Sequence, residues 1–150
     1  MLKLMAKLYS ATDIRASVGE SSSTEYIWNI GMAFSESLNE GGTVVVVRSG
    51  SADGVLTHAL LEGLLLMGRD VVVAGEGGDG EVRATIATQQ ADGGVLVEST
   101  GDASVFAVSL YDNTGTKLTD TNGLVDVINV AEAGNFLPAP SKGKISQLVQ

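Results

Sequence analysis

The residues best suited to chemistry stand in one short run, Glu98-Ser99-Thr100-Gly101-Asp102. This run places two hydroxyl groups between two carboxylates, directly after the apolar run Val95-Leu96-Val97. Hydroxyl and carboxylate side chains of this kind can bind a polar ligand or take part in nucleophilic and acid–base chemistry. A buried strand of an α/β protein delivers such a loop to the edge of its sheet where ligands bind, so we expect the run to lie at that edge.

Two further runs, 43–47 and 70–74, are rich in β-branched residues and have the composition of strands buried on both faces. Together with 95–97 they alternate with helical segments, and crossover helices make such strands parallel and the crossings right-handed. Parallel strands end at the same edge of a sheet. The loops that begin at Arg48, Gly75 and Glu98 should therefore meet.

Three helices are predicted around these strands from apolar residues at helical spacing. The first should begin at the capping-box sequence Ser22-Ser23-Thr24-Glu25 and end at Gly41-Gly42. The second carries Val55 to Met67 and ends at Gly68, and the third spans about Glu81 to Gln90. We expect Val82, Ile86 and Ala87 on the inner face of the third.

The second half of the chain adds an alternating strand, 105–111, which the short preceding link makes antiparallel to its neighbour. A turn at 112–115, a helix from Leu124 that ends near Gly134, and an irregular tail with Pro138 and Pro140 follow. The expected fold class is α/β: a three-layer α/β/α sandwich around a mixed four-stranded sheet whose last strand is antiparallel. We expect residues 1–150 to form a single domain.

The composition and net charge of the chain exclude some classes of function. The chain has 150 residues, no cysteine and a formal net charge of −9, which excludes a thiolate nucleophile and argues against nucleic-acid binding. The apolar stretch Met1 to Leu8 is too short to span a membrane and lacks the long apolar centre of a signal peptide. We therefore expect a cytoplasmic protein without a membrane partner, although an amphipathic membrane contact by this stretch is an alternative.

The predicted edge is acidic. Its three loops contain Arg48 as their only cation, against five carboxylates: Asp53, Glu76, Asp79, Glu98 and Asp102. Such an edge repels a phosphosugar, and Thr100 has no neighbouring histidine to act as a base. Ser99 and Thr100 are more simply interpreted as turn-capping hydroxyls, and the acids as solvated loop residues rather than a Mg²⁺ or Ca²⁺ site. His58 is interpreted as a partly exposed helical residue and Trp28 as a packing residue that could anchor an interface.

The order of these segments resembles the first domain of the α-D-phosphohexomutases, the phosphomannomutase/phosphoglucomutase family, from about Tyr9 to the end of the chain. The matching motifs are Asp13-Ile14-Arg15, Thr24-Glu25-Tyr26 with Ile30-Gly31-Met32-Ala33-Phe34, Val44 to Gly50, Leu60 to Val71, and Ala91-Asp92-Gly93-Gly94-Val95. The resemblance implies the strand order 2-1-3-4 in space, with the four predicted strands numbered along the chain.

The resemblance also implies a set of site residues. Thr100 stands at the family's phosphoserine position, where Gly101 replaces a histidine, Asp102 an asparagine and Ala103 a proline. The candidate residues are therefore Thr100 and Ser99 as a relic phosphoacceptor position, and Asp13, Arg15, Arg48 and Asp102 as ligand-binding positions. For Asp13 and Arg15 the alternative is a structural ion pair, either with each other or with the loop of Arg48. Family enzymes use Mg²⁺, but the loop that binds it is missing here, so no cofactor is expected.

Three functions are compatible with these observations. The leading hypothesis is a stand-alone, catalytically inactive relative of the mutase domain that acts by self-association, as a symmetric dimer, or by binding another protein. In the dimer, Leu2, Leu4, Met5 and Leu8 would cover exposed apolar surface. The alternative is a phosphomannomutase/phosphoglucomutase component that completes its site with another polypeptide. A third hypothesis is a small-ligand or cation sensor that uses the acidic edge.

Overall fold

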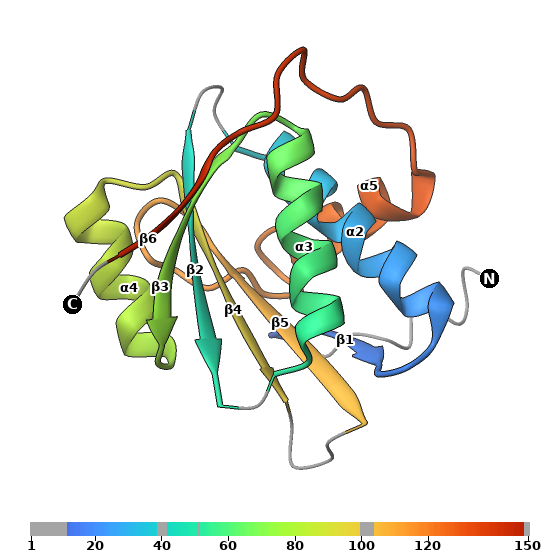
Figure 1. Ribbon diagram of the computed structural model, residues 1–150, viewed down its shortest axis with the longest axis horizontal. Coiled ribbons are helices and arrows are strands. Elements are labelled where there is room, and N and C mark those ends of the chain that lie inside the picture. The colour runs from blue at the N-terminus through green and yellow to red at the C-terminus, as the bar shows by residue number, and fades with distance from the viewer. Residues whose placement is uncertain (1–11, 39–41, 51, 100–103, 149–150) are drawn as a thin grey trace.

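The structure is a computed structural model that describes residues 12–38, 42–50, 52–99 and 104–148. Strands and helices alternate through most of the chain (Figure 1). In chain order they are β1 (Ile14–Ser17), α2 (Ser21–Glu36), β2 (Thr43–Ser49), α3 (Gly54–Leu66), β3 (Asp70–Glu76), α4 (Asp79–Gln89), β4 (Gly93–Ser99), β5 (Val105–Tyr111), α5 (Leu124–Ala133) and β6 (Ile145–Gln147).

The described strands form a six-stranded sheet in the order β1-β5-β4-β2-β3-β6. Its centre, β5-β4-β2-β3, is the predicted arrangement of four strands, with β2 parallel to both β3 and β4 and with β5 antiparallel to β4. The prediction of only four strands was wrong, because β1 adds antiparallel to β5 and β6 adds parallel to β3. Both additions are edge strands, and neither has the long β-branched run that marks the central ones.

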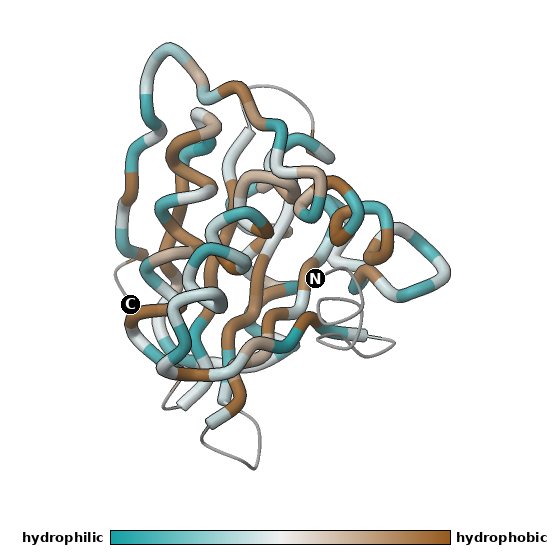
Figure 2. The backbone as a smooth tube through the Cα atoms, turned by 90° about the vertical axis from the view of Figure 1, so that its right-hand side faces the viewer, coloured by the Kyte–Doolittle hydropathy of each residue, from teal (hydrophilic) through white to brown (hydrophobic). Residues whose placement is uncertain are grey.

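Helices cover both faces of the sheet, as Figure 1 shows. The larger core lies between one face and helices α2, α3 and α5, and it contains Phe34, Leu60, Phe106 and Ile128. The smaller core lies between the other face and α4. The expected three layers are therefore present. In Figure 2 hydrophobic residues follow the strands in the middle of the molecule, whereas the outer connections consist mostly of polar residues.

Close contact between α2 and α3 depends on two glycines. The Cα atoms of Gly31 and Gly63 face each other, and a Cβ added at Gly31 would lie 2.6 Å from the carbonyl oxygen of Leu60. A Cβ at Gly63 would clash with the carbonyl oxygen of Trp28. The two helix backbones can approach so closely only because both positions lack a side chain.

The ends of the helices differ from the predictions in detail. Helix α2 begins at Ser21 after Glu20, which makes no side-chain capping bond, and it ends at Glu36. The predicted capping box therefore lies inside the first turns of the helix, and the predicted end at Gly41-Gly42 is too late. Ala87, expected to face the core, is exposed, and Thr85 is buried in its place. Gly68 and Gly134 end α3 and α5 with positive φ angles, as predicted.

The end of α2 is held by a buried arginine. Arg69 is only 6% exposed, and its Nη2 donates hydrogen bonds to the carbonyl oxygens of Ser35 (2.7 Å) and Leu38 (2.9 Å). These carbonyls lie in and just beyond the last turn of a helix, where the regular helical hydrogen bonds end. The Ser35 carbonyl also accepts a 3.2 Å hydrogen bond from the Leu38 amide. Arg69 therefore joins the end of α2 to the beginning of β3.

No helix within the described part of the chain is both long and apolar enough to cross a membrane.

Candidate functional site

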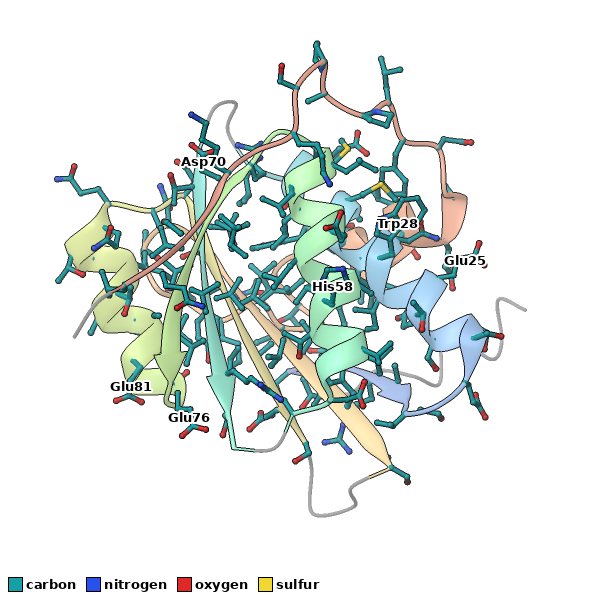
Figure 3. The ribbon with its side chains drawn as sticks, in the orientation of Figure 1. Glu25, Trp28, His58, Asp70, Glu76 and Glu81 are labelled. Atoms are coloured by element: carbon teal, nitrogen blue, oxygen red, sulfur yellow. The ribbon has the colours of Figure 1, made fainter. Side chains whose placement is uncertain are left out.

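The carboxyl ends of β2, β3 and β4 meet at one edge of the sheet, as the parallel pairing requires. Helices α3 and α4 begin at this edge. The end of β1 reaches it too, because the Val18 amide donates a 2.8 Å hydrogen bond to the carbonyl oxygen of Ser104, immediately before β5. We call this the carboxyl edge. Figure 3 places Glu76 at this end of the sheet and Asp70 at the opposite end.

Arg48 is the cation at the end of β2, and its guanidinium group is bound within its own loop. Nε and Nη2 both donate to the carbonyl oxygen of Ala52, at 3.2 Å and 2.5 Å. Across the sheet, Arg48 pairs in register with Glu76 of β3. The side chain therefore closes the β2–α3 connection and has an acidic residue beside it.

Asp13 and Arg15 form the ion pair that the sequence allowed. Arg15 Nε lies 3.0 Å from Asp13 Oδ1, and 47% of the arginine side chain is exposed against 14% of the aspartate. Arg15 pairs in register with Ala107 of β5, and Ala107 pairs with Glu98 of β4. The structure thus brings Arg15 into the same row of the sheet as Glu98, two strands away.

The carboxylates at the edge have two different roles. Glu76 and Glu98 are strand residues rather than the loop residues expected, and Glu98 pairs with Ser49 of β2. Asp53 instead caps α3, because its Oδ2 accepts a 2.9 Å hydrogen bond from the Leu56 amide. Two strand ends therefore present acids at the edge, while the Asp53 carboxylate satisfies a helix terminus.

Asp79 stabilises the beginning of α4. The hydroxyl of the buried Tyr111 donates to Asp79 Oδ1 at 2.6 Å, and Arg83 Nε lies 2.9 Å from Asp79 Oδ2. The hydrogen bond from Tyr111 holds the pKa of Asp79 below its ordinary value, and the charge of Arg83 contributes. Burial, and then the bond to Asp79, raises the pKa of Tyr111. This pair fixes α4 on the sheet.

Ser99 is the last residue of β4, is partly buried and pairs in register with Phe106. Alternation along the strand puts Ser99 on the same face as the buried Val97, the face covered by α2 and α3. Thr100 and Asp102 lie outside the described residues. Within the described ranges, no three His, Asp or Glu side chains are grouped to hold a metal ion. The described residues therefore form no site for the Mg²⁺ that the family enzymes use.

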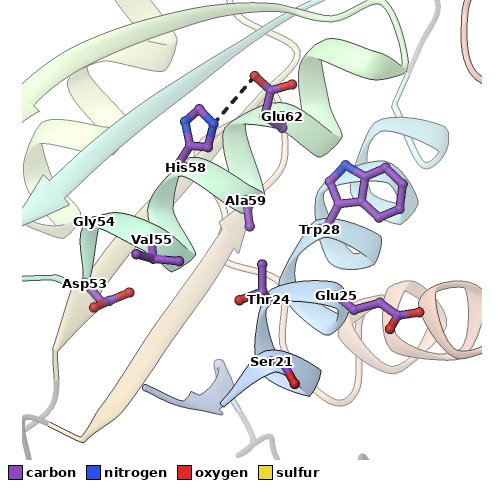
Figure 4. A pocket seen from close by; sticks show the side chains of 10 residues that line it. All are labelled: Ser21, Thr24, Glu25, Trp28, Asp53, Gly54, Val55, His58, Ala59 and Glu62. Carbon is purple, nitrogen blue, oxygen red and sulfur yellow. Dashed lines mark ion pairs between the residues drawn. The ribbon is translucent and has the colours of Figure 1, made fainter. Parts of the chain in front are cut away.

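A shallow groove of about 970 Å³ opens on the outer side of the helical layer and was not predicted as a site (Figure 4). It is lined by Ser21, Thr24, Glu25 and Trp28 of α2, by Val55, His58, Ala59 and Glu62 of α3, and by Asp53 and Gly54 where α3 begins. We call it the α2–α3 groove. Trp28 carried the one sequence signal for it, since this tryptophan was interpreted as a packing residue or an interface anchor.

A glutamate lies on each side of the apolar centre of the groove, Glu62 on α3 and Glu25 on α2. Glu62 lies 2.9 Å from Lys142 Nζ and 3.8 Å from His58 Nε2. The hydrogen bond from Lys142 holds the pKa of Glu62 below its ordinary value. Glu25 lies on the α2 side (Figures 3 and 4). His58 is exposed, so the sequence-based interpretation of a partly exposed helical residue is confirmed.

Known proteins with similar sequences are sugar-phosphate mutases. The phosphomannomutase of Salmonella typhimurium is 31% identical over 137 residues, which are 89% of this chain and 30% of that protein. The phosphomannomutase of Klebsiella pneumoniae is 28% identical over 131 residues, 87% of this chain and 83% of that sequence. The chain spans about 30% of the length of the Salmonella protein. No family model matches the chain.

A solved structure shows the same fold. A phosphoglucomutase/phosphomannomutase family protein from Burkholderia thailandensis superimposes with a TM-score of 0.71 over 93% of this chain and 32% of that one, at 19% identity. These comparisons confirm that the chain resembles one part of the phosphomannomutase and phosphoglucomutase proteins over most of its length.

Proposed function

We propose that this chain is a phosphohexomutase-like domain that does not transfer phosphate by itself and that acts by binding another protein chain, a second copy of itself included. One observation carries the proposal. The guanidinium group of Arg48 is bound to the carbonyl oxygen of Ala52, and Glu76 stands beside Arg48 in the sheet. Two N–H donors of this cation thus close its own loop, and the neighbouring carboxylate offsets its attraction for a phosphate.

Phosphoryl transfer depends on positive charge at the reacting group. Loss of a single stabilising donor slows comparable reactions by about 10²- to 10³-fold. At this edge Arg15 is paired with Asp13, and Glu76 and Glu98 lie at the ends of β3 and β4, the two strands that flank β2. Carboxylates repel the phosphate oxygens, so the described part of the edge disfavours both the binding of a phosphosugar and its reaction.

Binding to another chain is supported by apolar surface outside the carboxyl edge. Trp28 is 37% exposed and Val55 is 66% exposed, and both line the α2–α3 groove. Neighbouring exposed apolar side chains of this size favour burial against a partner. The proposed homodimer is a symmetric pair, the commonest form of protein self-association. The absence of cysteine fits the reducing cytoplasm as the proposed location.

The second candidate function is a mutase component that completes its active site with another polypeptide. It is favoured by the similarity to phosphomannomutases of which this chain spans about 30%. It is also favoured by the position of Ser99 at the end of β4, where loop and helix ends converge. In this case the partner would supply the cations and the metal site, and Thr100 or Ser99 would carry the phosphoryl group.

One experiment tests whether the chain accepts a phosphoryl group by itself. The full chain is incubated with glucose 1,6-bisphosphate and Mg²⁺, and its intact mass is measured, with a Ser99→Ala, Thr100→Ala double variant as the control. Our proposal predicts that each protein keeps its own unmodified mass, with no added phosphate. Addition of one phosphate to the wild type but not to the double variant would establish the component function instead.

Association is measured on the same protein by size-exclusion chromatography with light scattering. The proposed dimer gives twice the mass of one chain at micromolar concentration. A monomer under all conditions contradicts self-association, and the functional proposal then depends on a different partner.

A further inference from the structure

We propose that the α2–α3 groove binds a helix of a partner protein that carries apolar side chains on one face and lysine or arginine side chains beside them. This inference rests on the proposed function, because it names the partner chemistry for a chain that acts by association. It adds a surface and an occupant that the carboxyl edge does not provide.

The shape of the groove fits a helix. Ser21, Thr24, Glu25 and Trp28 occupy positions i, i+3, i+4 and i+7 of α2, and Val55, His58, Ala59 and Glu62 repeat this spacing on α3. Each set forms one stripe of about two helical turns, roughly 10 Å long. The groove residues of α2 and α3 all precede the contact between Gly31 and Gly63, from which the two helices separate. Two parallel stripes of this kind form the ridges between which a third helix packs.

The centre of the groove supplies apolar contacts. Trp28 and Val55 are two of the five large hydrophobic residues that are exposed in the described part of the chain. Figure 4 shows Ala59 between Val55 and Trp28, where its small side chain leaves the centre of the groove open. A tryptophan in such a position is a typical energetic anchor of an interface.

The charge of the rim selects the partner. None of the lining residues is a lysine or arginine, whereas Glu25 and Glu62 flank the apolar centre on opposite sides. Lys142 forms an ion pair with Glu62, on the α3 side of the groove. The Asp53 carboxylate accepts the bond that caps α3. In a symmetric contact between two such grooves, the glutamates Glu25 and Glu62 of one copy would face the same acidic residues of the other. Because like charges repel, a cationic helix is favoured over a symmetric contact here. The proposed homodimer would then use another surface.

The test uses Trp28 as its reporter, since it is the only tryptophan in the sequence. The full chain is titrated with a synthetic 14-residue peptide of leucine and lysine whose leucines recur at helical spacing. Two control peptides keep the length: one has the same residues in scrambled order, and the other has glutamate in place of lysine. We expect a saturable blue shift of Trp28 emission with the first peptide, weakened by added salt, and no saturable shift with the controls.

Matched variants locate the binding site. Glu25→Lys reverses the charge on one side of the groove, and Asp120→Lys makes the same change in an exposed turn between β5 and α5, outside the groove lining. We expect Glu25→Lys to weaken binding about fivefold or more and Asp120→Lys to leave it unchanged. Circular dichroism shows whether each variant is folded.

Several results would overturn the inference: no saturable shift, equal binding of the scrambled or glutamate peptide, or equal weakening by both variants. A blue shift that depends on the concentration of the chain without peptide would identify a second copy as the occupant and would also overturn it. None of these results touches the proposed lack of phosphate transfer, which the intact-mass experiment tests separately.

Discussion

The hydroxyl of Tyr111 donates a 2.6 Å hydrogen bond to Asp79 and thereby joins β5 to the first residue of α4. Tyr111 is fully buried in the smaller core. The bond therefore connects a core side chain to the helix that covers this face of the sheet. It also uses one of the carboxylates that sequence reasoning had assigned to the ligand-binding edge.

Replacement of Tyr111 by phenylalanine should destabilise the protein at neutral pH. The lost hydrogen bond is worth about 1 kcal/mol, and the exposed side of Asp79 can still be hydrated. Urea unfolding of wild type and Tyr111→Phe at pH 7 measures this difference. An equal free energy of unfolding in both proteins would show that the bond does not stabilise the fold.

The same variant has a predictable pH dependence. Because the pKa of Asp79 is lowered in the folded state, its contribution is present above the unfolded value near 3.9 and is lost as the pH falls through the folded value. The stability difference between wild type and Tyr111→Phe should therefore shrink between pH 7 and pH 2.5. A constant difference over this range would contradict the assignment.

The contact between α2 and α3 should not tolerate a methyl group. Gly31→Ala places a Cβ 2.6 Å from the Leu60 carbonyl oxygen, so the helices must separate, at a cost of about 1–3 kcal/mol. Gly80→Ala in α4 is the control, because no atom lies within 4 Å of its added Cβ. Thermal unfolding should show a lower Tm for Gly31→Ala and an unchanged or higher Tm for Gly80→Ala. The reverse order would refute the close packing.

The buried arginine should contribute more to stability than an exposed one. Arg69→Met leaves the carbonyl oxygens of Ser35 and Leu38 without these donors, which costs about 2–4 kcal/mol. Arg83→Met removes an exposed pair with Asp79 and should cost less than about 1 kcal/mol. Chemical unfolding of both variants tests the ranking, and similar losses would argue against the role of Arg69.

Two acidic residues precede helices, and only one of them, Asp53, caps its helix with its side chain. Asp53→Ala removes the bond to the Leu56 amide at the beginning of α3 and should cost about 1 kcal/mol. Glu20 precedes α2 but makes no side-chain capping bond, so Glu20→Ala should change stability little. Equal destabilisation by the two substitutions, measured by urea unfolding, would be incompatible with the capping geometry.

The central sheet could be predicted because its signal is local. The β-branched runs in β2, β3 and β4 and the helices between them determine parallel pairing, and their positions match the structure. β1 and β6 were missed as members of the sheet for a physical reason. β1 has four residues, and β6 has three residues that are all exposed. Their pairing depends on tertiary contacts that leave no periodic pattern in the sequence.

The candidate site was predicted less completely than the fold. The edge and the pair of Asp13 with Arg15 followed from topology and charge. The partners of Arg48 and Asp79 did not, because Ala52 contributes a backbone carbonyl and Tyr111 lies 32 residues away from Asp79. A buried arginine such as Arg69 is likewise contrary to the usual exposure of charged residues.

The most direct test of the account is the affinity of the carboxyl edge for a phosphosugar. The full chain is titrated calorimetrically with glucose 1,6-bisphosphate at low ionic strength, beside an Arg48→Ala variant. The account predicts no saturable binding stronger than a Kd of about 1 mM for either protein. Micromolar binding by the wild type that is lost in Arg48→Ala would contradict it, since Arg48 would then serve the ligand rather than its own loop.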